Sequence, residues 1–201
     1  AAPTLYNAES SQSDTANRKP LLNPADHRDV VGQVIEASSQ DVDQAMAAAT
    51  TMAPIWQATP IEDRARALRR AAQLLESRMQ PLLGLIVREA GKSLPNAIAE
   101  VREAVDFLRY YADQIEDNFN EDHHRPLGPV LCISPWNFPL AIFTGQVSAA
   151  LAAGNTVLAK PAEQTPLIAA QAVAILHEAG IPKEAVQLLP GAGETVGDQL
   201  V

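Results

Sequence analysis

The chain has 201 residues, enough for one substantial hydrophobic core or two small ones, and its composition of 47% hydrophobic and 19% charged residues is typical of a globular domain. The formal net charge of −9 argues against a nucleic-acid partner. The single cysteine excludes an internal disulfide framework and favours a reducing, cytoplasmic compartment, and the residues present show neither a signal-peptide pattern nor an apolar run long enough to span a bilayer.

The sequence pattern of residues 1–118 predicts a linker, then a strand, then a mostly helical segment. Residues 1–20 are rich in Ser, Asn, Ala and Gln without a repeating period, which predicts a flexible linker. Residues 29–37 are rich in Val and Ile, which predicts a β-strand. Four helices are expected after it: one capped by Ser39 or Asp41 and ending near residue 57, and three over 60–79, 81–90 with Gly91 as its end, and 95–116.

Two of these helices show an apolar face, because their apolar residues recur at steps of three and four. The two sets are Ile61, Ala65, Leu68, Ala72, Leu75 and Met79, and Ile98, Val101, Val105, Leu108, Ala112 and Ile115.

From residue 119 onward, short apolar runs alternate with helical ones. The expected strands are 130–133, 156–159 and 185–189, and the expected helices are 140–152, 166–179 with Thr165 as its N-cap, and 194–201. A βαβαβ order gives parallel strands joined by right-handed crossovers. The fold expected is therefore α/β: a Rossmann-like parallel half-sheet over 119–201, preceded by a mostly helical part over 21–118.

Three loops follow the carboxyl ends of the expected strands: Ser134–Asn137, Lys160–Gln164 and Gly191–Gly193. The carboxyl ends of parallel strands meet at one edge of a sheet, where open α/β sheets bind their ligands. In the first loop, Pro135 and Pro139 restrict the backbone and hold the amide of Asn137 in one geometry. The alternative is an ordinary strand-to-helix turn in which Asn137 lies near the helix cap.

These loops carry a family resemblance. Ser134-Pro135-Trp136-Asn137-Phe138-Pro139 resembles a signature of the aldehyde dehydrogenase superfamily, and two further matches follow in order. They are Ala153-Gly154-Asn155-Thr156-Val157 with Lys160-Pro161-Ala162-Glu163-Gln164-Thr165-Pro166, and Leu189-Pro190-Gly191-Ala192-Gly193-Glu194-Thr195-Val196-Gly197. The resemblance extends from about residue 20 to residue 201.

The resemblance implies a catalytic role for Asn137, whose amide would donate a hydrogen bond to the oxyanion of a hemithioacetal formed on a cysteine. It implies NAD as the cofactor, with Lys160 and Glu163 holding the adenosine ribose and Glu163 disfavouring the 2′-phosphate of NADP. The alternatives are a solvent-facing Lys160, a surface Glu163, or an ion pair between the two.

The remaining cofactor contacts are implied in the same way. Backbone around Ile133, Ser134, Pro135 and Trp136 would line the nicotinamide side. Ala162, Gly193 and Gly197 would lie against the rest of the dinucleotide; taken alone, the glycine spacing is a weak signal that fits an ordinary turn as well.

No nucleophile or metal site is expected in this chain. Cys132 lies inside an apolar strand, as small buried cysteines often do, and the family resemblance places the catalytic cysteine and the general-base glutamate beyond Val201. His123 and His124 are adjacent in sequence and lack a partner at metal-binding spacing, so no metal is expected.

Residues 87–92, 100–112 and 158–170 resemble one branch of the family, the L-glutamate γ-semialdehyde (1-pyrroline-5-carboxylate) dehydrogenases of bacterial bifunctional proline-catabolic proteins. This implies oxidation of that small-molecule aldehyde to glutamate, with FAD only in a separate upstream proline dehydrogenase domain. The implied partners are the rest of the same polypeptide and further copies of it. Because the chain starts at Ala1 and ends within an expected helix, we expect a piece of a longer protein that is inactive and poorly stable alone.

Two other functions fit the sequence. One is a different semialdehyde dehydrogenase, for example one acting on succinic semialdehyde. The other is a non-catalytic nucleotide-binding or assembly module that keeps the fold without the chemistry.

Overall fold

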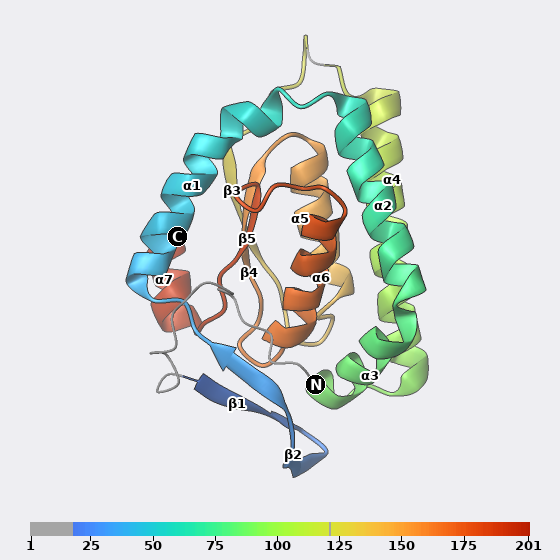
Figure 1. Cartoon of the computed structure of the whole chain (residues 1–201), viewed down its shortest axis with the longest axis vertical. Helices are drawn as coiled ribbons and strands as arrows, with labels where there is room; N and C mark the ends of the chain where they lie inside the picture. Colours follow the sequence, from blue (N-terminus) through green and yellow to red (C-terminus); the bar gives the residue numbers. More distant parts are fainter. Residues whose placement is uncertain (1–17, 121) are drawn as a thin grey trace.

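A three-stranded parallel sheet lies between layers of helices in the computed structural model, which describes residues 18–120 and 122–201 (Figure 1). The strands are β3 (Pro129–Ile133), β4 (Thr156–Lys160) and β5 (Val186–Leu188), in the spatial order β3-β4-β5. Helices α5 (Ala141–Ala152) and α6 (Pro166–Glu178) cover one face, and α1 (Ser39–Gln57) covers the other. The predicted Rossmann-like βαβαβ half-sheet is confirmed.

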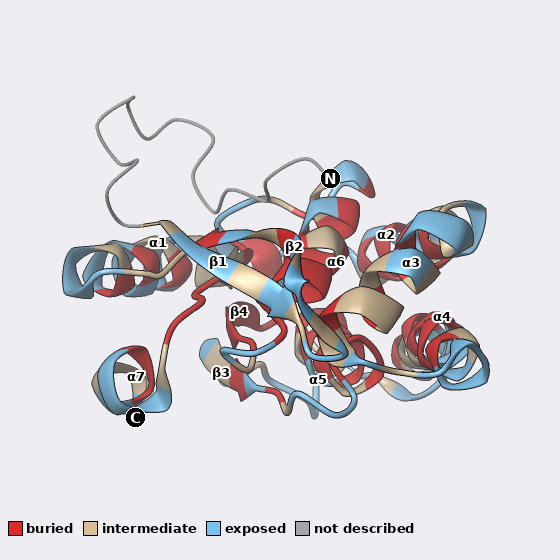
Figure 2. Cartoon of the chain, turned by 90° about the horizontal axis from the view of Figure 1, so that it is seen from below, coloured by how far each residue is buried: buried red, intermediate tan, exposed pale blue. Residues whose placement is uncertain are grey.

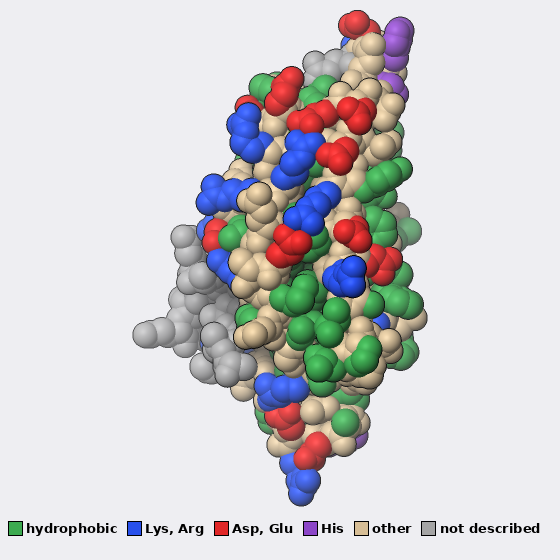
Figure 3. Space-filling model, turned by 90° about the vertical axis from the view of Figure 1, so that its right-hand side faces the viewer, with side chains coloured by type: hydrophobic (Ala, Val, Ile, Leu, Met, Phe, Trp, Pro, Cys, Tyr) green, Lys and Arg blue, Asp and Glu red, His purple; other side chains and the backbone are tan. Residues whose placement is uncertain are grey.

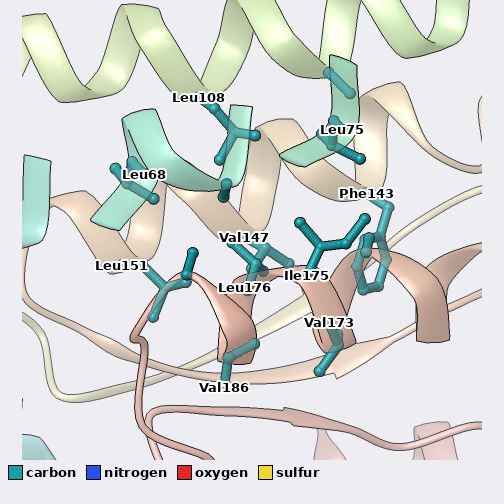
Figure 4. Close-up of a cluster of buried hydrophobic side chains, with 14 of the residues drawn as sticks. Leu68, Leu75, Leu108, Phe143, Val147, Leu151, Val173, Ile175, Leu176 and Val186 are labelled. Atoms are coloured by element: carbon teal, nitrogen blue, oxygen red, sulfur yellow. The ribbon is translucent and has the colours of Figure 1, made fainter. Parts of the chain in front are cut away.

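A second helical layer lies outside α5 and α6. It consists of α2 (Ile61–Ser77), α3 (Met79–Ala90) and α4 (Leu94–Asn118), whose buried residues face inward and whose exposed residues face outward (Figure 2). Side chains from α2, α4, α5, α6 and β5 meet in one apolar cluster, shown in Figure 4. Its members include Leu68, Leu75, Leu108, Phe143, Val147, Leu151, Val173, Ile175, Leu176 and Val186.

The two predicted helical faces form this interface. Nine of their twelve residues are buried, and Ile61, Met79 and Ile98 at the ends are half-buried. On the outward side, charged residues of both signs alternate along α2 and α4 (Figure 3). Arg69 pairs there with Asp113 and Glu116 across the two helices. Exposed pairs of this kind stabilise a fold by only about 0–1 kcal/mol each, so the apolar interface is the main source of stability.

An antiparallel hairpin precedes α1. It pairs β1 (Arg18–Asn23) with β2 (Asp26–Ile35), so the predicted strand exists but begins earlier and has a partner that we did not predict. Residues 18–20, expected in the linker, are part of β1, and residues 1–17 of that linker lie outside the described residues. The turn is closed by the side-chain carbonyl of Asn23, which accepts a hydrogen bond from the Ala25 amide at 2.9 Å.

Several predicted helix ends differ from the structure. Ser38, rather than Ser39 or Asp41, caps α1: its hydroxyl accepts from the Asp41 amide at 3.2 Å, and its own amide donates to the Asp41 carboxylate at 2.8 Å. Thr165 occupies the N-cap position of α6 but makes no side-chain capping bond. Gly91 ends α3 as predicted, in the left-handed region with φ 65°.

The last expected helix is a wide turn followed by a short helix. Residues Gly193–Gly197 form the π-type turn η2, and α7 (Asp198–Leu200) follows it. The Ala192 carbonyl accepts bonds from the amides of Thr195, Val196 and Gly197, which widens the turn. Within the described part of the chain, no helix has an apolar stretch long enough to cross a membrane.

Candidate functional site

The carboxyl ends of β3 and β4 are bonded to each other where the sequence predicts a site. Ile133 pairs with Lys160 in the sheet register, and the Ser134 amide donates to the Lys160 carbonyl at 3.1 Å. Gly197 of η2 lies beside the same lysine: a Cβ placed on Gly197 would be 3.5 Å from Lys160 Cε. The structure therefore brings Ile133, Ser134, Lys160 and Gly197 together at one edge of the sheet.

The corner after β3, residues 134–139, exposes the side chain of Asn137 to solvent. Asn137 is exposed, and Trp136 is 56% exposed beside it. The side-chain amide of Asn137 forms no hydrogen bond with residues 18–120 or 122–201. The N-cap position of α5 is occupied by Leu140. Asn137 therefore lies near the start of α5, in a strand-to-helix turn, but does not cap that helix, and its amide is available to a ligand.

Lys160 is a buried cation at the end of β4, only 5% exposed, so the alternative of a solvent-facing lysine is wrong. Its ammonium donates one hydrogen bond, to the Pro161 carbonyl at 3.3 Å, which leaves two N–H groups without a partner among the described residues. Burial lowers the pKa of Lys160, and the charge of Glu163 opposes that shift. A buried, underbonded ammonium at a sheet edge fits a hydroxyl-rich ligand such as a ribose.

Glu163 is exposed and does not form the suggested ion pair with Lys160. Its carboxylate accepts a bond from the Gln164 side chain at 3.2 Å, and the described ion pairs do not include it. Ala162 is half-buried, and its carbonyl accepts from the Thr165 amide at 3.1 Å. Gly193 is exposed, with open space where a Cβ would lie, so a ligand can approach its backbone closely.

Two buried glutamates complete the corners after β3 and β4, and the sequence analysis assigned no role to either. Glu100 on α4 accepts hydrogen bonds from the Leu140 amide at 3.2 Å and the Ala141 amide at 2.9 Å, at the start of α5. Glu89 on α3 accepts from the Leu167 amide at 2.6 Å and the Ile168 amide at 2.9 Å, at the start of α6.

A signal for both glutamates was present in the sequence. Each lies on the buried face of its own helix, in the sets Leu82, Ile86, Glu89 and Ala97, Glu100, Ala104 at steps of three and four. A carboxylate inside an apolar face is unusual unless it has dedicated partners. Because these carboxylates bond the first amides of α5 and α6, those amides are not available to a phosphate group.

The remaining candidate residues are unsuited to chemistry. Cys132 is buried, and burial raises the pKa of its thiol to about 11, so it is protonated at neutral pH. His124 stacks on the Phe119 ring at 4.9 Å and accepts a bond from the Asn120 amide at 3.0 Å. Among the described residues, no cluster of three His, Cys, Asp or Glu side chains is arranged to hold a metal ion.

A cavity of about 390 Å³ lies at the opposite, amino end of the sheet. It is lined by the end of α1, Arg64 of α2, and residues in the 119–126 segment, and none of the candidate site residues borders it. The candidate site is the open edge described above rather than this cavity.

Comparison with known proteins decides the family. Residues 11–201 match the aldehyde dehydrogenase family. The chain belongs to this family. It is 68% identical to the bifunctional protein PutA of Escherichia coli over 90% of its length, and 40% identical to 1-pyrroline-5-carboxylate dehydrogenase 2 of Bacillus subtilis over 99%. It spans only 14% of the first protein and 41% of the second.

Solved structures of aldehyde dehydrogenase relatives share the fold. Proline utilization A from Bdellovibrio bacteriovorus superposes with a TM-score of 0.88 at 34% identity, over 92% of this chain and 21% of that one. A Thermus 1-pyrroline-5-carboxylate dehydrogenase with bound NAD superposes with a TM-score of 0.86 at 40% identity, over 93% of this chain and 39% of that one. The layered α/β arrangement is therefore that of the aldehyde dehydrogenase fold.

Proposed function

We propose that the chain is part of an NAD-dependent dehydrogenase that oxidises L-glutamate γ-semialdehyde to glutamate in proline catabolism. The observation that carries the proposal is a pair of polar groups after the carboxyl ends of β3 and β4. The exposed Asn137 amide has no partner among the described residues, and the buried Lys160 ammonium has one. The 68% identity to PutA and the 40% identity to a 1-pyrroline-5-carboxylate dehydrogenase support the choice of substrate.

Asn137 is the catalytic residue of the proposal. Attack of a nucleophile on the aldehyde carbon breaks the carbonyl π bond and places negative charge on oxygen. An amide N–H held in advance at that oxygen stabilises the charge, and such donors typically change rates by about 10²–10³. The restricted backbone between Pro135 and Pro139 reduces the freedom of Asn137 before substrate arrives.

Lys160 and Glu163 are the proposed contacts of the adenosine ribose. The two free N–H groups of Lys160 would donate to a ribose hydroxyl, and the Glu163 carboxylate would accept from one. Backbone at Ile133, Ser134, Pro135 and Trp136 would line the nicotinamide, and Ala162, Gly193 and Gly197 would lie along the remainder. When bound, NAD⁺ supplies the hydride acceptor.

The overall reaction is aldehyde, NAD⁺ and water giving carboxylate, NADH and protons. The chain's one cysteine, Cys132, is buried and protonated, so the nucleophilic thiolate is assigned to the rest of the polypeptide. As part of the same proposal, FAD belongs to a separate proline dehydrogenase domain, the enzyme assembles from copies of itself, and it works in the reducing cytoplasm.

The test is NADH formation by the intact polypeptide that carries this chain, supplied separately with glutamate γ-semialdehyde, succinic semialdehyde and a simple alkyl aldehyde. We expect strong preference for the first. Preference for another aldehyde would be consistent with NAD-dependent aldehyde oxidation but would contradict a role in proline catabolism. NAD binding without turnover of any aldehyde would instead favour a non-catalytic module.

The Asn137→Ala variant tests the catalytic role in the same assay. We expect kcat to fall by about 10²–10³ with little change in the KM for NAD, because only the developing oxyanion loses a partner. Asn118→Ala is the matched control, since Asn118 is an exposed asparagine at the far end of α4. An unchanged kcat in Asn137→Ala would refute the role.

A further inference from the structure

The helices α5 and α6 share an unusual beginning. Neither has a side-chain capping bond from its own N-cap residue, Leu140 or Thr165. Each instead starts on a buried glutamate that comes from the outer helical layer, and each follows directly on a loop of the candidate site. Unpaired amides at a buried helix start would be costly, and each glutamate accepts hydrogen bonds from two of them.

We propose that the two glutamates are positioning residues with separate tasks: Glu100, together with Lys92, holds the Asn137 corner for chemistry, and Glu89 holds the Lys160–Glu163 corner for cofactor binding. This inference rests on the proposed dehydrogenase function and assigns residues that touch neither substrate nor cofactor.

Glu100 has the larger set of partners. It is 1% exposed, and one carboxylate oxygen accepts the Leu140 and Ala141 amides while the other accepts a bond from the Lys92 ammonium at 2.6 Å. Bonds between a charged acceptor and backbone amides at a helix start are strong, because the helix dipole adds to them. The start of α5 is therefore fixed to α4, only four residues after Asn137.

Lys92 extends this connection to the corner itself. Its ammonium lies 4.4 Å from the centre of the Phe138 ring, the distance of a cation–π contact. Phe138 is the residue after Asn137 and is 42% exposed, so this contact limits the motion of a side chain that solvent alone would leave free. Glu100, Lys92 and Phe138 thus form a continuous set of contacts that ends beside the Asn137 amide.

Glu89 acts on the other corner. Both of its oxygens are used by the first amides of α6, at Leu167 and Ile168, and the residue is 5% exposed. Glu163 lies two residues before Thr165, the N-cap position of α6, and Asn137 lies three residues before Leu140, the N-cap position of α5. Burial raises the pKa of Glu89 to about 7, while its two amide partners favour the charged form. No contact links Glu89 with Glu100 among the described hydrogen bonds, so each corner has its own support.

The test compares Glu100→Gln and Glu89→Gln in the intact polypeptide. Each variant replaces one acceptor oxygen with an NH₂ group that cannot accept a hydrogen bond. Glu89→Gln therefore loses one of its two amide bonds, whereas Glu100→Gln loses either the bond from Lys92 or the bonds from the amides of Leu140 and Ala141. We expect Glu100→Gln to lower kcat by about 10–100-fold with the KM for NAD changed less than about threefold, because the oxyanion donor is misplaced. We expect Glu89→Gln to raise the KM for NAD by roughly tenfold with kcat changed less than about threefold. Glu178→Gln, on the exposed far end of α6, should change neither.

Hydrogen–deuterium exchange supplies a readout that does not need turnover. Exchange should increase at residues 136–142 alone in Glu100→Gln and at residues 162–169 alone in Glu89→Gln. Equal changes of both kinetic parameters in both variants, or increased exchange at both corners in either variant, would overturn the division of tasks. If the unmodified enzyme turns over no aldehyde but exchange stays confined to one corner in each variant, the proposed function fails while the separate support of the corners stands.

Discussion

At the scale of single residues, the edge of the sheet presents three polar groups in three different environments. Among residues 18–120 and 122–201, the exposed Asn137 amide has no hydrogen-bond partner, the buried Lys160 ammonium has one, and the exposed Glu163 carboxylate is bonded to Gln164. Burial fixes the place of the ammonium at a cost in solvation, which a ligand hydroxyl would offset. The exposed Glu163 carboxylate discriminates between ligands, because its negative charge repels an anionic group that comes close to Lys160.

Glu163→Gln should relax the choice of cofactor. Its carboxylate repels a 2′-phosphate, so its removal should lower the preference for NAD over NADP by roughly tenfold, mostly through improved use of NADP. The measurement is the ratio of kcat/KM values for the two cofactors. Glu184→Gln, at an exposed position before β5, is the control. An unchanged ratio would place Glu163 away from the ribose.

Cys132→Ala should leave turnover nearly intact. Burial raises the pKa of the Cys132 thiol to about 11, so almost none of it is thiolate at pH 7. The variant loses only a small buried group and should keep kcat within about threefold of wild type. Loss of activity with the protein still folded would mean that this thiol takes part in the reaction.

At the scale of elements, the sequence predicted most helices and strands because periodicity and turn residues are local signals. The apolar faces of α2 and α4, the glycine that ends α3 and the three parallel strands were all predicted. The hairpin partner β1 was missed because its pairing with β2 depends on a short turn after Asn23.

The helix starts after the site loops could not be predicted from local sequence. Thr165 is a favourable N-cap residue by type, yet the amides of α6 are bonded to Glu89, 78 and 79 residues earlier in the chain. The same holds for α5 and Glu100. A tertiary contact thus replaced the side-chain cap that local propensity predicts. The candidate ligand-binding residues could be identified from the sequence more easily than the buried residues that hold their loops in place.

Glu89 should give the chain a pH-dependent stability. Its pKa is about 7 when folded and has an ordinary value of 4.5, so between these values the folded state binds more protons than the unfolded state. The free energy of unfolding that Glu89 contributes therefore falls as pH rises through this window and is constant above it. The difference in melting temperature, wild type minus Glu89→Gln, should decrease from pH 5 to pH 7.

Glu178→Gln is the control for this measurement. Its bond with Arg78 lowers the pKa of Glu178, so its contribution is present above the ordinary value and is lost only in more acidic solution. The difference between wild type and this variant should stay flat from pH 5 to pH 7. A flat difference for Glu89→Gln as well would show that its carboxyl does not titrate in this range.

At the scale of the whole molecule, the described residues form a sheet with helices on both faces and a second helical layer on one side (Figures 1 and 2). The order β3-β4-β5 leaves β3 and β5 as edge strands within the described part of the chain. Edge strands carry unpaired backbone groups and favour association, so we expect the 201-residue chain alone to have a small free energy of unfolding. Its stability should then depend heavily on the interface between the helical layers.

Two neighbouring residues of α4 separate the contribution of this interface from that of the surface charges. Leu108 is 1% exposed in the apolar cluster of Figure 4, whereas Arg109 forms an exposed ion pair with Glu76. Leu108→Ala should lower the free energy of unfolding by about 2–5 kcal/mol, because it leaves a cavity that the surrounding helices cannot fill completely. Arg109→Ala should lower it by about 1 kcal/mol or less. Urea unfolding of wild type and Arg109→Ala measures the smaller effect. For a chain of small stability, Leu108→Ala should already be largely unfolded without urea, and the free energy of unfolding of wild type then sets the lower limit of its effect. Equal effects of the two substitutions would mean that the ion pairs along α2 and α4 hold the layers together as much as the apolar contacts do.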